Sequence, residues 1–166
     1  MTFLLDANVP IDARRLYYPM SRVPEFWEWL QSEAEAGRVK MPRETWEEIS
    51  EGDDDLGDWA CDPAVKTALL LDVEVDVGLL RRVVNEGYAP DLSDTEQPKL
   101  GKDPFLIAHA LSAPGEFVVV TTEVSRPSAQ RANRHVPDVC RALGIEAIDT
   151  FEMIRRLDFS TRWRSR

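Results

Sequence analysis

The sequence predicts an α/β fold: a three-layer α/β/α sandwich around a central, mainly parallel sheet. Short apolar runs, typical of strands buried on both faces, occur at residues 2–6, 115–123 and 145–149. Helix-like segments separate these runs, and short strands alternating with helices favour a parallel sheet covered on both sides. The 166 residues fit one domain with a sizeable core, expected at 1–158 and followed by a basic tail at 159–166.

Prolines near helix starts and glycines near helix ends mark the predicted elements of the first half. Asn8 fits the cap of a first short helix, and Gly37 fits the end of the second helix. In chain order we expect a strand at 2–6, a short helix at 8–18, a helix at 23–39, a strand or extended link at 39–42, a helix at 42–52, and a turn or the start of a short helix at 52–58.

The second half begins with an ambiguous segment. Residues 63–88 favour helix with a break allowed at 69–78, where partial alternation of apolar and polar residues makes a strand the competing interpretation. After it we expect a loop at 88–102, a helix at 103–112, a strand at 115–123, a long basic loop at 125–136, a helix at 137–144, a strand at 145–149 and a helix at 150–157.

Carboxylates stand at the polar ends of several core-forming segments. Asp6 and Glu123 each end a predicted strand, and Asp103 opens a predicted helix. Ligands of open parallel α/β sheets bind beyond the carboxyl ends of the strands, so Asp6 and Glu123 are expected on one rim. Asp103 would face that rim from a helix N-terminus, where the dipole favours negative charge. Glu48, preferred over the adjacent Glu47, is a fourth candidate.

A divalent cation would allow these acids to share one site. Clustered carboxylates repel one another, and burial raises their pKa values further. Mg²⁺ takes oxygen ligands and keeps several waters, so carboxylates around an open site suit it, and it supports phosphodiester hydrolysis. Each acid also has a structural explanation: Asp6 and Asp103 as helix caps, Glu48 on a solvated helix face and Glu123 in a turn.

Four motifs, in order along nearly the whole chain, carry a resemblance to a known family. They are FLLDANV at the first strand, WEEIS on a helix, KDPFLIAHAL at the helix that Asp103 opens, and VVVTTE at a strand end. The chain resembles the PIN-domain ribonucleases, which include the toxins of many bacterial toxin–antitoxin pairs. The later segment HVPDVCRALGIEAIDTFEMI resembles a less studied, PIN-like branch of that superfamily.

The resemblance implies a PIN-like sandwich whose acidic centre holds Mg²⁺ or Mn²⁺ and consists of Asp6, Glu48, Asp103 and Glu123. It implies that Asn8 and Thr121 orient those ligands. It also implies a metal-dependent endoribonuclease, the toxin of a bacterial pair, with RNA as substrate, a cognate antitoxin as partner and often a homodimer. The family usually has Asp at the fourth position, so the longer Glu123 is expected to meet the metal directly or through water.

Charge is unevenly distributed along the chain. The net charge of −10 argues against a non-specific nucleic-acid binder, but residues 121–166 carry 9 arginines against 6 acids. A basic stretch follows Glu123 and consists of Arg126, Arg131, Arg134 and His135. Two interpretations stay open: these side chains bind RNA phosphates near the metal, or they belong to a solvated loop.

The sequence also predicts a cytoplasmic protein without membrane contact. No apolar stretch approaches the length of a membrane span, and the N-terminus lacks a basic leader followed by a cleavage region. Cys61 and Cys140 lie far apart without metal-ligand spacing, which favours reduced thiols.

A second class of function fits the same residues. In it, the chain is a non-catalytic PIN-fold module that binds another protein. The tryptophans of the acidic half are expected in the core or at an interface; they are Trp27, Trp29, Trp46 and Trp59. A phosphatase with an Asp nucleophile is disfavoured, because that chemistry needs a second Asp two residues after Asp6, where Asn8 stands.

Overall fold

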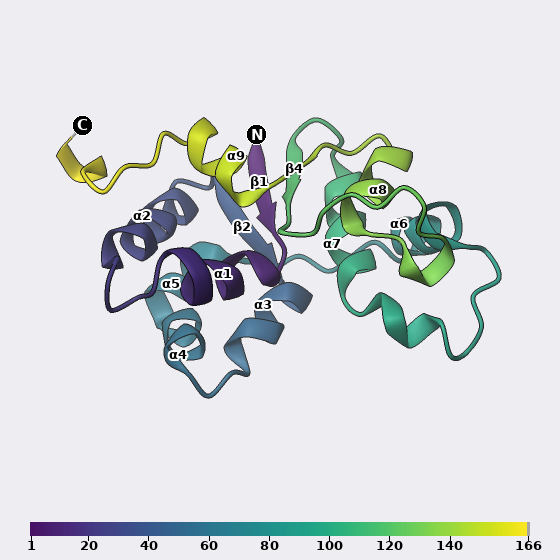
Figure 1. Ribbon diagram of the computed structural model, residues 1–166, viewed down its shortest axis with the longest axis horizontal. Helices are drawn as coiled ribbons and strands as arrows, with labels where there is room; N and C mark the ends of the chain where they lie inside the picture. The colour runs from purple at the N-terminus through teal and green to yellow at the C-terminus, as the bar shows by residue number, and fades with distance from the viewer. Residues whose placement is uncertain (166) are drawn as a thin grey trace.

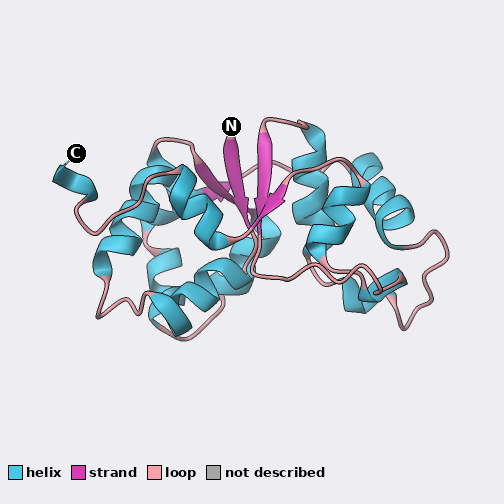
Figure 2. Ribbon diagram, turned by 45° about the horizontal axis from the view of Figure 1, so that its top comes forward, coloured by secondary structure: helices cyan, strands magenta, loops and turns pink. Residues whose placement is uncertain are grey.

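A five-stranded parallel sheet separates two layers of helices in the computed structural model (Figure 1). The structure describes residues 1–165. The strand order is β3-β2-β1-β4-β5, and Figure 2 shows the strands fanned out between helices on both sides. The strands are β1 at Thr2–Leu5, β2 at Val39–Pro42, β3 at Leu70–Leu71, β4 at Phe117–Val120 and β5 at Ala147–Ile148.

The central strand β1 contributes side chains to the apolar clusters on both faces of the sheet. Successive side chains of a strand point to opposite faces. Phe3 and Leu5 therefore join one cluster, whereas Leu4 joins the other together with Val119 of β4. All four residues are buried, which explains why the strand sequences are continuous apolar runs.

Helices cover both faces and so form the outer layers. The layer on the Phe3 side contains α1 at Asn8–Asp12, α2 at Pro24–Glu35, α4 at Asp55–Cys61, α5 at Pro63–Leu69 and α9 at Thr150–Arg156. The layer on the Leu4 side contains α6 at Val77–Arg82, α7 at Asp103–Ser112 and α8 at Val136–Ala142. Helix α3, at Arg43–Ser50, contacts α4 in one layer and α7 in the other.

Shorter helical turns complete the described chain. Two are π-helical, η1 at Ala13–Tyr17 and η2 at Val83–Tyr88. Three are 3-10 turns, η3 at Gln97–Leu100, η4 at Arg131–Asn133 and η5 at Trp163–Ser165.

The predicted three-layer α/β/α sandwich with a parallel sheet is confirmed. The ambiguous segment 63–88 is not one helix: it forms α5, β3, α6 and η2, so the break lies within 69–78 and the strand interpretation holds for Leu70–Leu71. Strand β3 forms because Leu70 pairs with Met41 of β2. The segment 52–58 starts a helix, since the Asp54 side chain accepts hydrogen bonds from two amides at the start of α4.

The end of the described chain folds back against α2. The Phe159 ring lies 5.6 Å from the Phe26 ring and 4.7 Å from the Trp29 ring, measured between centroids. Trp163 also packs against this apolar cluster. The segment predicted as a basic tail thus begins with residues that cover the core, while its last residue, Arg166, lies outside the described residues.

The tryptophans of the acidic half lie in or against the same cluster. Trp27 and Trp29 are buried, and Trp46 and Trp59 pack against the cluster from partly buried positions.

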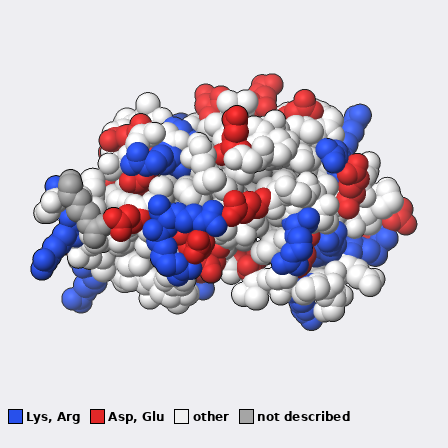
Figure 3. Space-filling model, turned by 90° about the horizontal axis from the view of Figure 1, so that it is seen from above, with Lys and Arg blue, Asp and Glu red and all other residues white. Residues whose placement is uncertain are grey.

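Figure 3 views the edge of the molecule at which the strands begin. Acidic and basic side chains are interspersed on that face, so charges of opposite sign compensate one another locally.

Candidate active site

Asp6 and Glu123 follow the two central strands at the carboxyl edge of the sheet. Strands β1 and β4 pair in parallel with Leu5 opposite Val120, and the Asp6 amide donates to the Val120 carbonyl at 2.9 Å. The chain then leaves the sheet at Asp6 on one strand and at Thr121 on its neighbour. The structure therefore brings Asp6 and the Thr121–Glu123 turn to the same edge, although they are more than 110 residues apart in sequence.

Hydrogen bonds hold the Asp6 carboxylate in place. Thr121 Oγ1 donates to Asp6 Oδ2 at 2.7 Å and accepts from Asn8 Nδ2 at 3.3 Å and from the Glu123 amide at 3.1 Å. The Thr122 amide donates to Asn8 Oδ1 at 3.0 Å. Because Asp6 is 6% exposed and Thr121 is 1% exposed, these bonds orient the carboxylate where little water competes.

Asp103 and Glu48 bring two more carboxylates to this edge. Asp103 is the first residue of α7, and Glu48 lies on α3, which packs against α7. Burial raises the pKa of Asp103 to about 8, and repulsion by the other three acids adds to the effect. Burial also raises the pKa of Glu48, with repulsion by Asp6 adding to it and the Lys102 cation opposing it. Asp103 thus interacts with each of the other three predicted acids, and Asp6 interacts with Glu48 and Glu123 as well.

The pKa of Asp6 shows the same balance of forces. Burial raises it, repulsion by Glu123 raises it further, and the hydrogen bond from Thr121 lowers it. Three of the four acids therefore bind protons more tightly than they would in water. We call these four side chains, Asp6, Glu48, Asp103 and Glu123, the acidic centre.

The acidic centre has the donor chemistry of a site for a hard divalent cation. Its ligands would all be carboxylate oxygens, and a doubly charged ion would relieve their mutual repulsion. A buried hydroxyl without a hydrogen-bond partner, that of Tyr88, interacts with two of the acids. Within residues 1–165, however, no three His, Cys, Asp or Glu side chains are arranged so that they could hold a metal ion as they stand. The residues fit the charge and hardness of the cation, whereas a preformed cage is absent from the described residues.

Glu123 has a structural task besides its place in the centre. Its Oε2 accepts a hydrogen bond of 2.8 Å from the Val136 amide, the first residue of α8. His135, which precedes that helix, is held by a 2.7 Å hydrogen bond between its Nδ1 and the Val124 carbonyl. One carboxylate oxygen of Glu123 is thereby committed to the helix start, which leaves Oε1 for the acidic centre.

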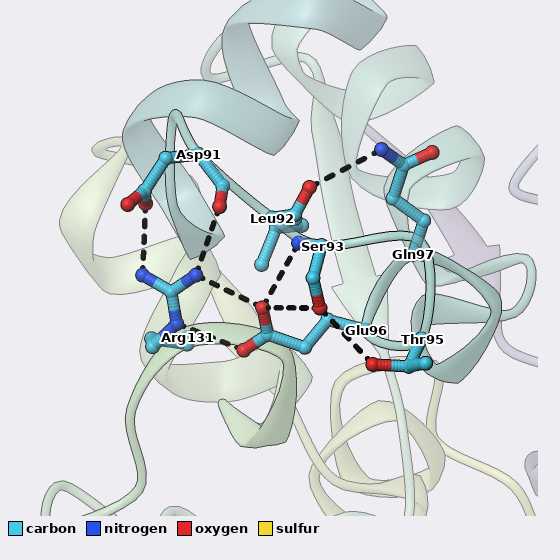
Figure 4. A network of polar contacts seen from close by, with 7 residues as sticks. All are labelled: Asp91, Leu92, Ser93, Thr95, Glu96, Gln97 and Arg131. Atoms are coloured by element: carbon cyan, nitrogen blue, oxygen red, sulfur yellow. Dashed lines mark hydrogen bonds and ion pairs between the residues drawn. The ribbon is translucent and has the colours of Figure 1, made fainter.

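Two arginines of the basic stretch are engaged within the molecule. Arg131 forms ion pairs with Asp91 and Glu96, each at 2.8 Å, and also donates to the Asp91 carbonyl (Figure 4). The Arg131 guanidinium lowers the pKa of Glu96 to about 2. Arg134 donates to the backbone carbonyls of Gly87 and Asp138. These contacts join the 125–136 loop to neighbouring segments, so neither guanidinium is free to bind phosphate without breaking them.

Arg126 differs from the other two arginines because its side chain is exposed. The Asp138 carboxylate fixes its backbone by accepting from the Arg126 amide at 2.6 Å and from the Ser125 hydroxyl at 2.5 Å. A cavity of about 460 Å³ lies at this loop, lined by Arg126, Ser128, Ala129, Gln130, Arg131 and Asn133. Of the predicted RNA-binding arginines, Arg126 is the best placed to reach an external anion.

A family model matches nearly the whole described fold and covers the acidic centre. It carries the description "Domain of unknown function (DUF4411)" and spans residues 3–161. The chain belongs to the DUF4411 family. A search of curated proteins found no match to the chain. Among residues 1–165 of this DUF4411 domain, no helix is both long enough and apolar enough to cross a membrane.

Sequence reasoning missed three side chains that act on the acidic centre of this DUF4411 domain. Lys102 interacts with Glu48 and supplies a positive charge at the edge of the centre. Cys140 is buried, and burial together with the charges of two of the acids raises its pKa to about 12. Tyr88 is the third. Lys102 could have been found from its position beside Asp103, but no sequence signal connects Tyr88 or Cys140 with acids on other elements.

Proposed function

We propose that this DUF4411 protein is a metal-dependent endoribonuclease that hydrolyses RNA phosphodiester bonds. The observation that supports it is the convergence of four carboxylates from separate parts of the fold: the end of β1, helix α3, the start of α7 and the turn after β4. Burial and repulsion within this group raise the pKa of Asp103 to about 8. A fold rarely retains such a destabilising group of acids without a task, and perturbed pKa values cluster at functional sites. The ordered resemblance to PIN-domain ribonucleases supports the same conclusion.

In this proposal Asp6 and Asp103 hold Mg²⁺ or Mn²⁺, and Glu48 and Glu123 complete the acidic centre. A cation held by these side chains would supply Lewis-acid chemistry, polarising the phosphoryl group and lowering the pKa of the attacking water. Asp103 must lose its proton before the cation binds, since metal ligands are deprotonated. Thr121 keeps the Asp6 carboxylate oriented through its 2.7 Å hydrogen bond.

Neighbouring cations would hold the negatively charged substrate. Arg126 is exposed on the loop that follows Glu123, and Lys102 directly precedes Asp103. Both would contact phosphates of the RNA strand, which position a substrate without selecting its sequence. This arrangement would reconcile an acidic protein with a polyanionic substrate, because the two cations and the metal would contact the strand.

The proposal extends to the biological role suggested by the PIN-like motifs. The protein would be the cytoplasmic toxin of a bacterial toxin–antitoxin pair, neutralised by a cognate antitoxin and able to form a homodimer. A neighbouring gene for a small DNA-binding protein would support this role, and co-purification with its product would test it.

Cleavage of RNA in the presence of Mn²⁺ tests the enzymatic proposal. We expect the wild type to cut single-stranded RNA and EDTA to abolish cutting. The double variant Asp6→Asn and Asp103→Asn should lose at least about 100-fold in rate, because it removes two ligand charges. Asp94→Asn, which changes an exposed acid outside the centre, is the matched control. Equal rates for the wild type and the double variant would exclude the proposed site.

A second candidate function is a non-catalytic module that binds another protein. A group of exposed apolar side chains favours it: Tyr17 of η1 and Phe151 of α9 are 45% and 42% exposed and meet edge to face at 5.0 Å. Leu16, which precedes Tyr17 in sequence, is 55% exposed. If the wild type cuts no RNA but Tyr17→Ser with Phe151→Ser abolishes capture of the neighbouring gene's product, this second function replaces the first.

A further inference from the structure

Tyr88 places an unpaired hydroxyl group in the interior of the molecule. It is the last residue of η2 and is 7% exposed. Within residues 1–165 its hydroxyl oxygen is buried without a hydrogen-bond partner. A buried hydroxyl that makes no hydrogen bond destabilises the fold, and phenylalanine would fill the same space without that cost. The hydroxyl therefore calls for an explanation outside the stability of the fold.

The packing of η2 and the charges near Tyr88 show which part of the molecule its hydroxyl adjoins. Helix η2 packs against α7, which begins at Asp103, and against α8, whose first amide donates to Glu123. Burial raises the pKa of Tyr88; Asp103, Cys140 and Glu123 raise it further, and the Arg134 cation opposes them. Cys140 itself interacts with Asp6 and Asp103, so it lies beside the same centre. The buried hydroxyl thus lies beside the acidic centre.

The backbone around Tyr88 is held tightly. Arg134 donates a hydrogen bond to the carbonyl of Gly87, the preceding residue. A Cβ atom on Gly87 would lie 2.6 Å from Val139 Cγ1, so η2 approaches α8 at a distance that favours glycine. The π-helical geometry of η2 is rare in proteins, and where it occurs it is often at a functional site. The position of the Tyr88 ring is therefore set by packing on α8 and not by its own hydroxyl.

Asp103 lacks the support that its partner Asp6 receives. Thr121 donates to the Asp6 carboxylate, whereas the Asp103 carboxylate accepts no hydrogen bond within the described part of the chain. Carboxylates that bind metals are usually hydrogen-bonded in turn, because the second group fixes their orientation. An unpaired donor on η2 and an unsupported acceptor on α7 thus belong to two helices that pack against each other.

We propose that Tyr88 is a positioning residue of the acidic centre, whose hydroxyl donates to the Asp103 carboxylate, directly or through one water molecule, when a divalent cation is bound. The inference rests on the proposed metal-dependent function. Tyr88 then does for Asp103 what Thr121 does for Asp6. The hydroxyl is retained at a cost to the metal-free fold because it orients a ligand of the metal-bound state.

Tyr88→Phe tests the proposal, since it removes the hydroxyl and keeps the ring. We expect the melting temperature of the metal-free variant to equal or exceed that of the wild type, because an unpaired buried oxygen is lost. We expect its affinity for Mn²⁺, measured by isothermal titration calorimetry, to fall by about 10-fold or more. Tyr18→Phe, at a tyrosine whose ring stacks on Phe26 and whose hydroxyl is not buried without a partner, is the matched control and should change neither quantity.

The outcomes separate this inference from the function on which it rests. If the wild type binds Mn²⁺ and Tyr88→Phe binds it equally well, the role of Tyr88 is excluded and the metal-dependent function stands. If the wild type binds no Mn²⁺, both are excluded. A lower melting temperature of metal-free Tyr88→Phe would also overturn the inference, because the hydroxyl would then serve the fold.

Discussion

Asp103 controls the charge of the acidic centre through its protonation state. With a pKa of about 8, its carboxyl is mostly protonated at neutral pH when no cation is present. Burial is the main cause, and the neighbouring acids contribute the rest. Cation binding must therefore displace a proton, so the affinity for Mn²⁺ should rise with pH up to about 8.

The raised pKa of Asp103 predicts a pH dependence of stability. The folded state holds this proton more tightly than the unfolded chain does, so the metal-free protein should lose stability as pH rises from about 4 to about 8. The contribution of this one group is at most about 1.4 kcal/mol per pH unit. Asp103→Asn should remove it and be the more stable protein at the upper end of that range. Urea unfolding in EDTA measures both proteins.

Comparing the two proteins isolates Asp103 from other titrating groups. His109, for example, has a pKa lowered by burial, and it changes stability with pH in the opposite direction. That contribution is common to the wild type and the variant. Parallel stability curves for the two would show that Asp103 is not a buried, raised-pKa acid.

Thr121 joins Asp6, Asn8 and the Glu123 amide through one hydroxyl. Thr121→Val preserves the shape of the side chain but removes the hydroxyl from all three of these hydrogen bonds. We expect a loss of about 1–3 kcal/mol in the free energy of unfolding. We also expect a 10- to 100-fold weaker affinity for Mn²⁺, roughly the effect of losing a group that orients a metal ligand.

Thr161→Val, at an exposed threonine, is the control for Thr121→Val in denaturant unfolding and in Mn²⁺ titration. It should match the wild type in both measurements. If Thr121→Val also matched the wild type, the hydrogen bonds at Asp6 would have no energetic role.

At the scale of single residues, the sequence predicted the acids that stand at the ends of apolar runs. Asp6, Glu123 and Asp103 could be found because a polar residue at the end of a buried segment must lie at an edge of the core. The partners of Arg131 could not be found, because Asp91 and Glu96 lie 35 or more residues away and meet it only in the folded chain. Tyr88 was missed for the same reason.

Among the elements, α4 approaches the end of α3 closely and so helps to position α3, the helix that contains Glu48. A Cβ atom on Gly57 of α4 would lie 2.0 Å from the carbonyl oxygen of Gly52, just beyond the end of α3. The two backbones can meet this closely only because position 57 has no side chain. The placement of one acid of the centre thus depends on a glycine in another helix.

Gly57→Ala should therefore destabilise the protein, although alanine is the better helix former. Overpacking of this kind typically costs about 1–3 kcal/mol or more, because the clash is with backbone and cannot be relieved by a rotamer change. Gly52→Ala, whose Cβ would meet its neighbours at ordinary distances of 3.4 Å and beyond, is the control. Denaturant unfolding of both variants measures the difference, and equal stabilities would contradict the close approach.

Most helices and strands were predictable from their own residues, whereas strand β3 was not decided by them. Strand β3 has two residues, and its extended backbone is explained by pairing with β2. Residues 63–88 contain apolar side chains at spacings that also suit a helix, so the local pattern could not decide between the two. The neighbouring strand decided it, and that information is not local.

For the whole molecule, the fold class followed from alternation of buried strands with helices, but the distribution of charge did not follow from counting. The arginines of residues 121–166 are largely paired with acids in the described chain, among them Arg141 with Asp138 and Arg156 with Glu152. Net charge by segment is therefore a poor guide to the surface that a polyanion would meet. The position and the partners of each guanidinium determine where a polyanion could bind.

Arg126 and Arg131 should consequently respond in opposite ways to removal. Arg126→Ala should weaken RNA binding and reduce its salt dependence by the equivalent of about one phosphate contact, with the melting temperature unchanged. Arg131→Ala should lower the melting temperature, because it breaks the ion pairs to Asp91 and Glu96. Fluorescence anisotropy at several salt concentrations and thermal denaturation measure the two effects. A reversed pattern would place the RNA at Arg131.

Strand β1 precedes β2, β3, β4 and β5 in the chain, yet it occupies the middle of the sheet, with β2 on one flank and β4 on the other. A nascent chain therefore displays Asp6 and Glu48 long before the residues that surround them. The four acids can meet only after Glu123 has left the ribosome, and Glu123 lies 117 positions after Asp6. Fragments released before Glu123 is made would lack the complete set, so any activity of the centre requires translation to continue past this residue.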